Sequence, residues 1–171
     1  MDAFKEFLSG EFKPVQIDLE NPNWHTEADI PSKPGWYYIT TTAPLSVLQR
    51  QTLWQTEYTR ADGETAKVRN YDIAKRSLRF TEEFARFWNT TRVYSGIGKS
   101  LQARAREHTF PDPGTAGLAL AYYPDLYEYD WVFNYRRFDE YHPTSNNHGV
   151  HLLLGEQIWR EMNGWPLLCA G

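Results

Sequence analysis

The amino-acid sequence predicts a small α/β (α+β) domain, in which a three-stranded antiparallel sheet is flanked by helices and carries a largely helical insertion. Residues 36–41 and 92–97 are aromatic and β-branched runs of strand length. Residues 127–135 alternate aromatic and other side chains with a period of two, which indicates a strand with one aromatic face. The 171 residues, of which 41% are hydrophobic, are enough for one core, so residues 1–171 are expected to form one domain.

The N-terminal part of the chain leads into the first strand. Residues 2–8 are predicted to form a short helix, and residues 12–35 contain four prolines and are predicted to be extended. Residues 1–34 are therefore expected to form an N-terminal arm. Gly35 opens the first strand, and Pro44 ends it.

Residues 44–91 are polar and basic, and we interpret them as an insertion between the first two strands. Helical stretches are expected around residues 45–58 and 81–89, with a turn at Asp62-Gly63 between them.

The second strand leads into two further predicted helices. Ser100 is a plausible N-cap for a helix over residues 101–108. After the aromatic strand, a final helix is expected over residues 148–163, because Asn163-Gly164 and Pro166 are typical of a helix end. The aromatic face of residues 127–135 fits a buried core, and stacking on unpaired bases is the alternative.

The composition excludes several classes of protein. Cys169 is the only cysteine, so an intrachain disulfide or a cysteine-rich zinc module cannot form. Charged residues are spread through the first 14 residues, and no stretch is apolar enough for a signal peptide or a membrane span. We therefore expect a cytoplasmic protein with no membrane partner.

The charges are unevenly distributed along a chain whose formal net charge is −4. Residues 44–110 hold twelve Lys and Arg against seven Asp and Glu, whereas the rest of the chain holds six against 15. A basic middle can form a local phosphate-binding surface. A solvated helical region of mixed charge is the alternative.

Two tyrosine tripeptides and a spaced helical motif stand out. Gly35-Trp36-Tyr37 opens the first strand, and Tyr94-Ser95-Gly96 lies in the second. Three further side chains follow Tyr94 at +7, +10 and +14 on one predicted helix, namely Leu101, Arg104 and His108. The final helix carries Glu156 and Asn163.

This pattern resembles the GIY-YIG nuclease superfamily, with Trp36 and Ser95 in place of the middle residues of the two tripeptides. The resemblance covers the first strand, residues 92–108 and about residues 126–163. Tyr37 and Tyr94 lie 57 positions apart. In layout the chain is therefore most similar to type II restriction-like members, which carry an insertion between the two motifs.

The resemblance implies a metal-dependent endonuclease that hydrolyses phosphodiester bonds in DNA, in a restriction, phage or mobile-element role. The implied catalytic residues are Tyr37, Tyr94, Arg104, His108, Glu156 and Asn163. The implied cofactor is Mg²⁺, for which Mn²⁺ can substitute, and Glu156 is its implied ligand. Basic residues in and beside the insertion are candidates for DNA contacts, namely Lys67, Lys75, Arg76, Arg79, Lys99 and Arg106. Cutting both strands would need a homodimer or sequential nicking.

Glu156 has surroundings that suit a metal ligand. Its i−4 and i+3 neighbours, Leu152 and Trp159, are apolar, so the carboxylate is expected at the edge of the core-facing stripe. A buried glutamate without a partner is costly, so a cation should meet it. Mg²⁺ can be held by one carboxylate together with waters and substrate oxygens. A surface glutamate near a helix start is the alternative.

Arg104 and His108 are four residues apart, so one helical face presents both. Arg104 offers a fork of donors to phosphate oxygens, and His108 can orient a water or a tyrosine or donate to the leaving group. Tyr37 is the expected proton acceptor and Tyr94 the group that holds water or phosphate. A free phenol has a pKa of about 10, so this role needs a nearby cation. The alternatives are an exposed helix and two core tyrosines.

Two other functions remain open from the sequence. A protein with this fold that binds nucleic acid without cleaving it is the main alternative. A zinc-bound hydrolase is the weaker one, because His142, His148 and His151 lie within ten residues, followed by Glu156.

Overall fold

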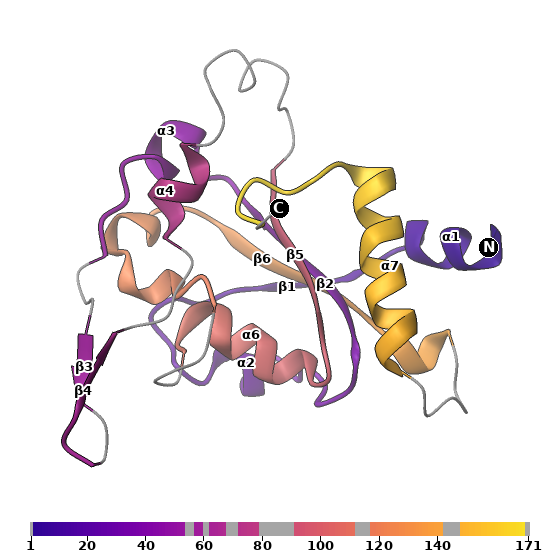
Figure 1. The fold of residues 1–171 in the computed structure, drawn as a ribbon, viewed down its shortest axis with the longest axis horizontal. Coiled ribbons are helices and arrows are strands. Elements are labelled where there is room, and N and C mark those ends of the chain that lie inside the picture. Colours follow the sequence, from indigo (N-terminus) through magenta and orange to yellow (C-terminus); the bar gives the residue numbers. More distant parts are fainter. Residues whose placement is uncertain are drawn as a thin grey trace.

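The structure, a computed structural model, describes residues 2–53, 57–59, 62–67, 72–78, 91–111, 117–141 and 148–169. Its centre is a four-stranded antiparallel sheet with the strand order β1-β6-β2-β5 (Figure 1). The strands are β1 (Lys13–Gln16), β2 (Gly35–Thr41), β5 (Arg92–Gly98) and β6 (Trp131–Arg137). The mixed α/β class and the antiparallel sheet are as the sequence predicts.

The sheet is buried on both faces because its central strands alternate between two apolar clusters. Trp36 on β2 packs in a cluster with helix α7 (His148–Asn163) and helix α1 (Asp2–Ser9). Tyr37, the next residue, packs in the other cluster, on the side of helix α6 (Leu101–Thr109). Trp36 Nε1 donates to the backbone oxygen of Leu152 at 3.0 Å, which fixes α7 on its face of the sheet.

The expectation of a three-stranded sheet is wrong, because the N-terminal arm contributes the strand β1. The four residues of β1 pair antiparallel with β6 and form one edge of the sheet. Pro14 lies within this strand. An edge strand tolerates proline, because only one side of the strand must donate hydrogen bonds. The arm also contains the short helix α2 (Trp24–Glu27), which contacts α6.

The aromatic strand begins later than its alternation predicts. Residues 124–126 form a 3₁₀ turn, and Tyr127, whose hydroxyl donates to the backbone oxygen of Ala121, lies in the turn that follows. From Trp131 onward the alternation holds, and Trp131, Phe133 and Tyr135 are buried. The assignment of this part of the aromatic face to the core is therefore confirmed.

The described part of the insertion is mixed, so the prediction of a largely helical insertion is wrong there. It contains the helices α3 (Leu45–Leu48) and α4 (Ile73–Ser77) and the hairpin of β3 (Glu57–Thr59) and β4 (Thr65–Lys67). Among the described residues of the helix expected at 45–58, only α3 is helical. The turn at Asp62-Gly63 is confirmed, with Gly63 at φ 85°. The helix expected at residues 81–89 lies outside the described residues. The hairpin projects from the body of the molecule (Figure 1).

The remaining helices agree with the sequence. Ser100 caps α6, because its Oγ accepts a hydrogen bond from the backbone N–H of Ala103 at 3.2 Å. Helix α7 ends at Asn163, and Gly164 follows at φ 83°. In the part of the chain that the structure describes, no helix has the length and apolar character to span a membrane.

Candidate active site

Tyr37 lies at the centre of a buried polar cluster between β2 and α6. Its hydroxyl oxygen is 2.8 Å from Nε2 of His108, and Nε of Arg104 donates to the same oxygen at 3.1 Å. Arg104 and His108 are one turn apart on α6, so the shared helical face expected from their spacing is confirmed. His108 is fully buried, so the alternative of an exposed helix end is wrong for this residue.

The hydrogen bonds of His108 determine its tautomer. The backbone N–H of Leu118 donates to Nδ1 at 3.2 Å, so Nδ1 carries no proton. The proton of the neutral ring is therefore on Nε2, which donates to Tyr37. Nε2 cannot also accept from Nη2 of Arg104, 3.3 Å away, because a ring with two accepting nitrogens would carry no proton. Burial, and then the charge of Arg104, hold the pKa of His108 well below its usual value, which keeps the ring neutral.

Arg104 is held by two side chains, Tyr37 and Glu107. Besides its bond to Tyr37, it forms an ion pair with Glu107, which lies three residues farther along α6. Burial alone would lower the pKa of Arg104, but Tyr37, Glu107 and Tyr94 raise it, so the guanidinium is charged. The hydroxyl oxygen of Tyr37 thus accepts two hydrogen bonds, one of them from a cation.

Gly96 provides the space for the Tyr37 hydroxyl. The two residues are directly opposite in the β2–β5 pairing. A Cβ atom at position 96 would lie 2.4 Å from the Tyr37 hydroxyl oxygen and 2.7 Å from its Cζ. The last residue of the Tyr94-Ser95-Gly96 tripeptide therefore has a specific role, because any side chain there would displace the phenol.

Tyr94 completes the aromatic wall of the cluster. Its ring is stacked on that of Tyr37, with centroids 6.2 Å apart, and lies 4.5 Å from the ring of His108. Phe133 stacks on Tyr37 with its centroid 5.0 Å away. Both tyrosines are buried, but the phenol oxygen of Tyr37 is engaged by charged and polar groups, which distinguishes it from an ordinary core tyrosine.

Glu156 lies on α7 and forms a second polar group together with Arg160 and Ser95. Its Oε1 accepts a hydrogen bond from Nη2 of Arg160 at 2.6 Å, which confirms the expectation that a cation meets this carboxylate. Nε of Arg160 donates to Oγ of Ser95 on β5 at 2.9 Å. Burial raises the pKa of the Glu156 carboxyl, and the guanidinium groups of Arg160 and Arg104 lower it only in part. The neighbours Leu152 and Trp159 are buried, as expected.

A small cavity has residues of both polar groups, Tyr37 and Glu156, in its lining. It has a volume of about 10 Å³, close to what one water molecule requires, and it is lined by Phe12, Trp36, Tyr37, Ser95, Gly96, Glu156 and Trp159. Helices α6 and α7 both contact the edge strand β5, and they lie on opposite faces of the sheet. Arg104 influences the pKa of Glu156. The structure therefore places Tyr37, Arg104, His108 and Glu156 around one edge of the sheet.

Asn163 is placed apart from this cluster. It is the last residue of α7, and its side-chain amide donates to the backbone oxygen of Trp159 in the same helix at 2.9 Å. This bond gives Asn163 a local role at the helix end, and its catalytic role stays a prediction.

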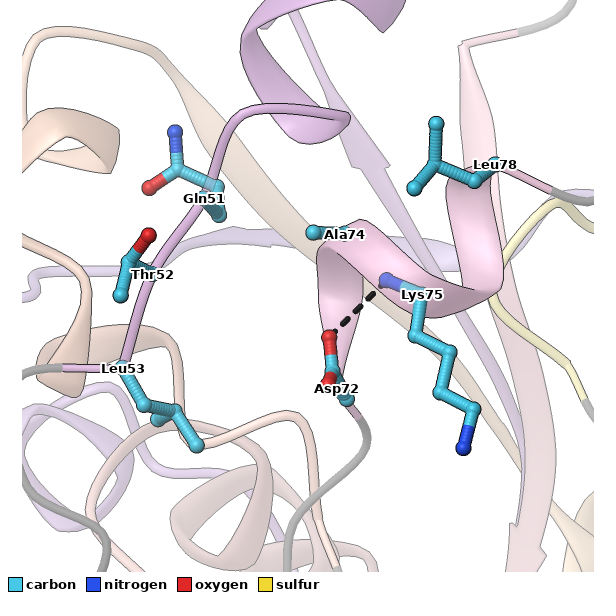
Figure 2. A pocket seen from close by; sticks show the side chains of 7 residues that line it. All are labelled: Gln51, Thr52, Leu53, Asp72, Ala74, Lys75 and Leu78. Carbon is cyan, nitrogen blue, oxygen red and sulfur yellow. Dashed lines mark hydrogen bonds between the residues drawn. The ribbon is translucent and has the colours of Figure 1, made fainter.

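The basic residues expected to contact DNA are dispersed over several elements. Lys67 is exposed at the end of β4, and Lys99 is exposed directly after β5. Lys75 is exposed on α4, beside an open hollow of about 610 Å³ between this helix and residues 51–53 (Figure 2). These three lysines are accessible to solvent, and their contacts with DNA stay a prediction.

Two arginines of the DNA-contact set are partly engaged within the protein. Arg76 donates from Nη1 to the backbone oxygen of Leu168 at 2.7 Å and so ties α4 to the C-terminal segment. Arg106 is partly buried on α6 and lowers the pKa of His25, after the larger effect of burial. Arg79 lies outside the described residues.

The histidines of the proposed zinc site pack against an aromatic ring. The rings of His148 and His151 lie 4.7 and 6.0 Å from that of Phe138. His142 lies outside the described residues. Within the described ranges, no three side chains of His, Cys, Asp or Glu gather as a metal site.

Sequence reasoning missed the roles of Ser95, Arg160 and Cys169. The backbone N–H of Ser95 donates to Sγ of Cys169 at 3.2 Å, and Arg160 joins Ser95 to Glu156. The i,i+4 spacing of Glu156 and Arg160 was a usable signal for their ion pair. The contacts of Ser95 span 65 and 74 residues of sequence, and no local pattern indicates them.

Comparisons of the chain with protein-family models, with curated proteins and with solved structures found no match.

Proposed function

We propose that this protein is a metal-dependent endonuclease that hydrolyses phosphodiester bonds in DNA. The observation that carries the proposal is the Tyr37 hydroxyl, whose oxygen accepts hydrogen bonds from Arg104 and neutral His108, while Tyr37 and Glu156 both line one small cavity. Donors of this kind stabilise negative charge on an oxygen. They suit Tyr37 to accept a proton from the attacking water.

The other residues take roles that follow from their contacts. Arg104 provides the positive charge that stabilises the phosphate in the transition state, and its bond to Tyr37 places that charge next to the base. His108 holds Tyr37 in place through Nε2, since both of its ring nitrogens are occupied and the ring is fully buried. Tyr94 stacks on the ring of Tyr37, contacts the ring of His108 at a tilted angle, and so positions both.

The surroundings of Glu156 fit a divalent cation of the Mg²⁺ type. Only Oε1 of the carboxylate is engaged by the described residues, which leaves Oε2 available as a ligand. Burial raises the pKa of this carboxyl despite two arginines, so additional positive charge would stabilise its ionised form. Mg²⁺ retains waters and accepts substrate oxygens, so one carboxylate is sufficient. When bound, such a cation lowers the pKa of water and neutralises phosphate charge.

The test is a nicking assay on supercoiled plasmid DNA with Mg²⁺, with Mn²⁺ and with EDTA. We expect metal-dependent nicking by the wild type and at least a hundredfold slower nicking by Glu156→Ala. Glu161→Ala is the matched control, because Glu161 lies on the same helix, is exposed and forms an ion pair with Lys5 at the surface. Equal rates for the wild type and Glu156→Ala would contradict the assignment of the metal ligand.

A DNA-binding protein without catalytic activity is the second candidate. The Glu156–Arg160 ion pair favours it, because a cation must share this carboxylate with a guanidinium. A binder of this kind would show affinity that falls steeply with salt but no nicking with either metal.

For the nuclease, cleavage of both strands requires two copies of the chain or two successive nicks, and we propose a homodimer.

A further inference from the structure

We propose that Arg160 is a positioning residue of this site, which holds Oε1 of Glu156 against strand β5 and leaves Oε2 to bind the cation. The proposal rests on the proposed function and extends it to a residue that lies outside the tyrosine, arginine and histidine cluster.

The contacts of Arg160 join three parts of the fold. Nη2 donates to Oε1 of Glu156 at 2.6 Å, one turn earlier on α7. Nε donates to Oγ of Ser95 at 2.9 Å, and Nη2 lies 3.3 Å from the backbone oxygen of the same residue. The guanidinium thus connects the helix that carries the carboxylate to the strand that carries Tyr94 and Gly96.

The C-terminal segment fixes the guanidinium from another side. The ring of Trp165 lies 4.4 Å from Cζ of Arg160, which is a cation–π contact. Sγ of Cys169 lies 3.5 Å from Nη2 and also accepts the backbone N–H of Ser95. A guanidinium restrained on these sides holds the carboxylate in one orientation.

An ordinary ion pair within a helix would not have these features. Exposed i,i+4 pairs contribute only about 0.3–0.5 kcal/mol and have no fixed geometry. Here the side chains of Arg160 and Glu156 are only 12% and 13% exposed. In addition, Arg160 has a hydrogen-bond acceptor in Ser95, whose side chain occupies the middle position of the second tripeptide. The side chain that accepts the hydrogen bond from Arg160, Ser95, therefore lies between Tyr94 and Gly96 in the chain.

Charge and positioning lead to opposite expectations for metal binding. A guanidinium beside a carboxylate repels a divalent cation, so loss of the charge alone would strengthen metal binding. Loss of a residue that orients a metal ligand typically weakens metal affinity or activity by roughly 10–100-fold. The sign of the change in affinity therefore separates the two roles.

The experiment measures Mn²⁺ binding by isothermal titration calorimetry, together with thermal unfolding and plasmid nicking. The variants are Arg160→Gln and Ser95→Ala, and Arg137→Gln is the control, because Arg137 pairs with Asp139 and Glu140 at the far end of β6. We expect Arg160→Gln to raise the Kd for Mn²⁺ about tenfold or more and to lower kcat at saturating Mn²⁺ by roughly 10–100-fold.

Ser95→Ala removes one anchor of Arg160 without a change of charge, so it should change both quantities in the same direction by a smaller factor. It also carries the test if Arg160→Gln does not fold. Unchanged or tighter Mn²⁺ binding by a folded variant would overturn the positioning role. Wild-type protein that neither binds Mn²⁺ nor nicks DNA would instead overturn the proposed function itself.

Discussion

Substitution of Gly96 by alanine tests the geometry of the Tyr37 cluster. The added Cβ would lie 2.4 Å from the Tyr37 hydroxyl oxygen, whereas ordinary contacts begin at 3.4 Å. The phenol must therefore move by about 1 Å, and its hydrogen bonds to His108 and Arg104, at 2.8 and 3.1 Å, cannot both survive. Insertion of a methyl group into a packed core typically costs about 1–3 kcal/mol, and a 1 Å displacement at a reacting group can reduce the rate about a hundredfold.

Urea denaturation measures the loss of stability, and plasmid nicking by the folded protein measures the loss of rate. Gly149→Ala is the matched control, because a Cβ at position 149 meets nothing within 4 Å and alanine favours the helix by about 0.5–1 kcal/mol. In a Tyr37→Leu background, which lacks the phenol, Gly96→Ala should lose most of its cost in stability. A Gly96→Ala protein as stable and as active as the wild type would refute the close approach of the phenol to β5.

Three further predictions concern the same cluster. Because the pKa of buried His108 is lowered, the unfolded chain binds a proton below about pH 6.5 that the folded chain does not, so the free energy of unfolding falls with decreasing pH. Denaturation of His108→Gln at several pH values between 6.5 and 5 should therefore show a shallower fall in the free energy of unfolding than the wild type shows. Tyr37→Phe should lower kcat by about 10²–10⁴-fold, whereas Tyr127→Phe, which removes a hydrogen-bonded hydroxyl outside the site, should leave kcat unchanged. Arg104→Lys keeps the charge but loses the planar fork, so single-turnover nicking should slow by roughly 10–100-fold, and a wild-type rate would rule out the bond from Nε to Tyr37.

The elements that carry the site could be predicted because their signals are local. The β2 and β5 strands are short aromatic and β-branched runs, and α6 and α7 have recognisable caps and ends. The spacing of Arg104 and His108 was sufficient to place both on one face of α6. The apolar neighbours of Glu156 likewise indicated that a cation would lie beside it.

The errors arose where tertiary contacts override local pattern. Pro14 indicated an extended arm, but pairing with β6 makes its segment an edge strand. Tyr127 continued the aromatic alternation, but its hydroxyl bonds to Ala121 and the chain turns there. Residues 57–67 are polar, with no strand-like alternation, yet they contain a hairpin because Asp62-Gly63 provides the turn between two short strands.

The connection between the two polar groups depends on three-dimensional proximity alone. Ser95 contacts Arg160 and Cys169 across 65 and 74 residues, and the small cavity is lined by residues of β2, β5 and α7 together with Phe12. Single-sequence patterns report which face of an element is buried. They do not report which polar groups meet when two buried faces approach the same strand.

The most direct test of the central claim is the single-turnover rate of Mg²⁺-dependent plasmid nicking by the wild type, Tyr37→Phe, Glu156→Ala and the double variant. If Tyr37 and Glu156 act on the same phosphate, the double variant should be no slower than the slower single variant, because residues that act as a unit are non-additive. Rates that multiply in the double variant, or nicking that neither substitution affects, would contradict a shared active site at the edge of β5.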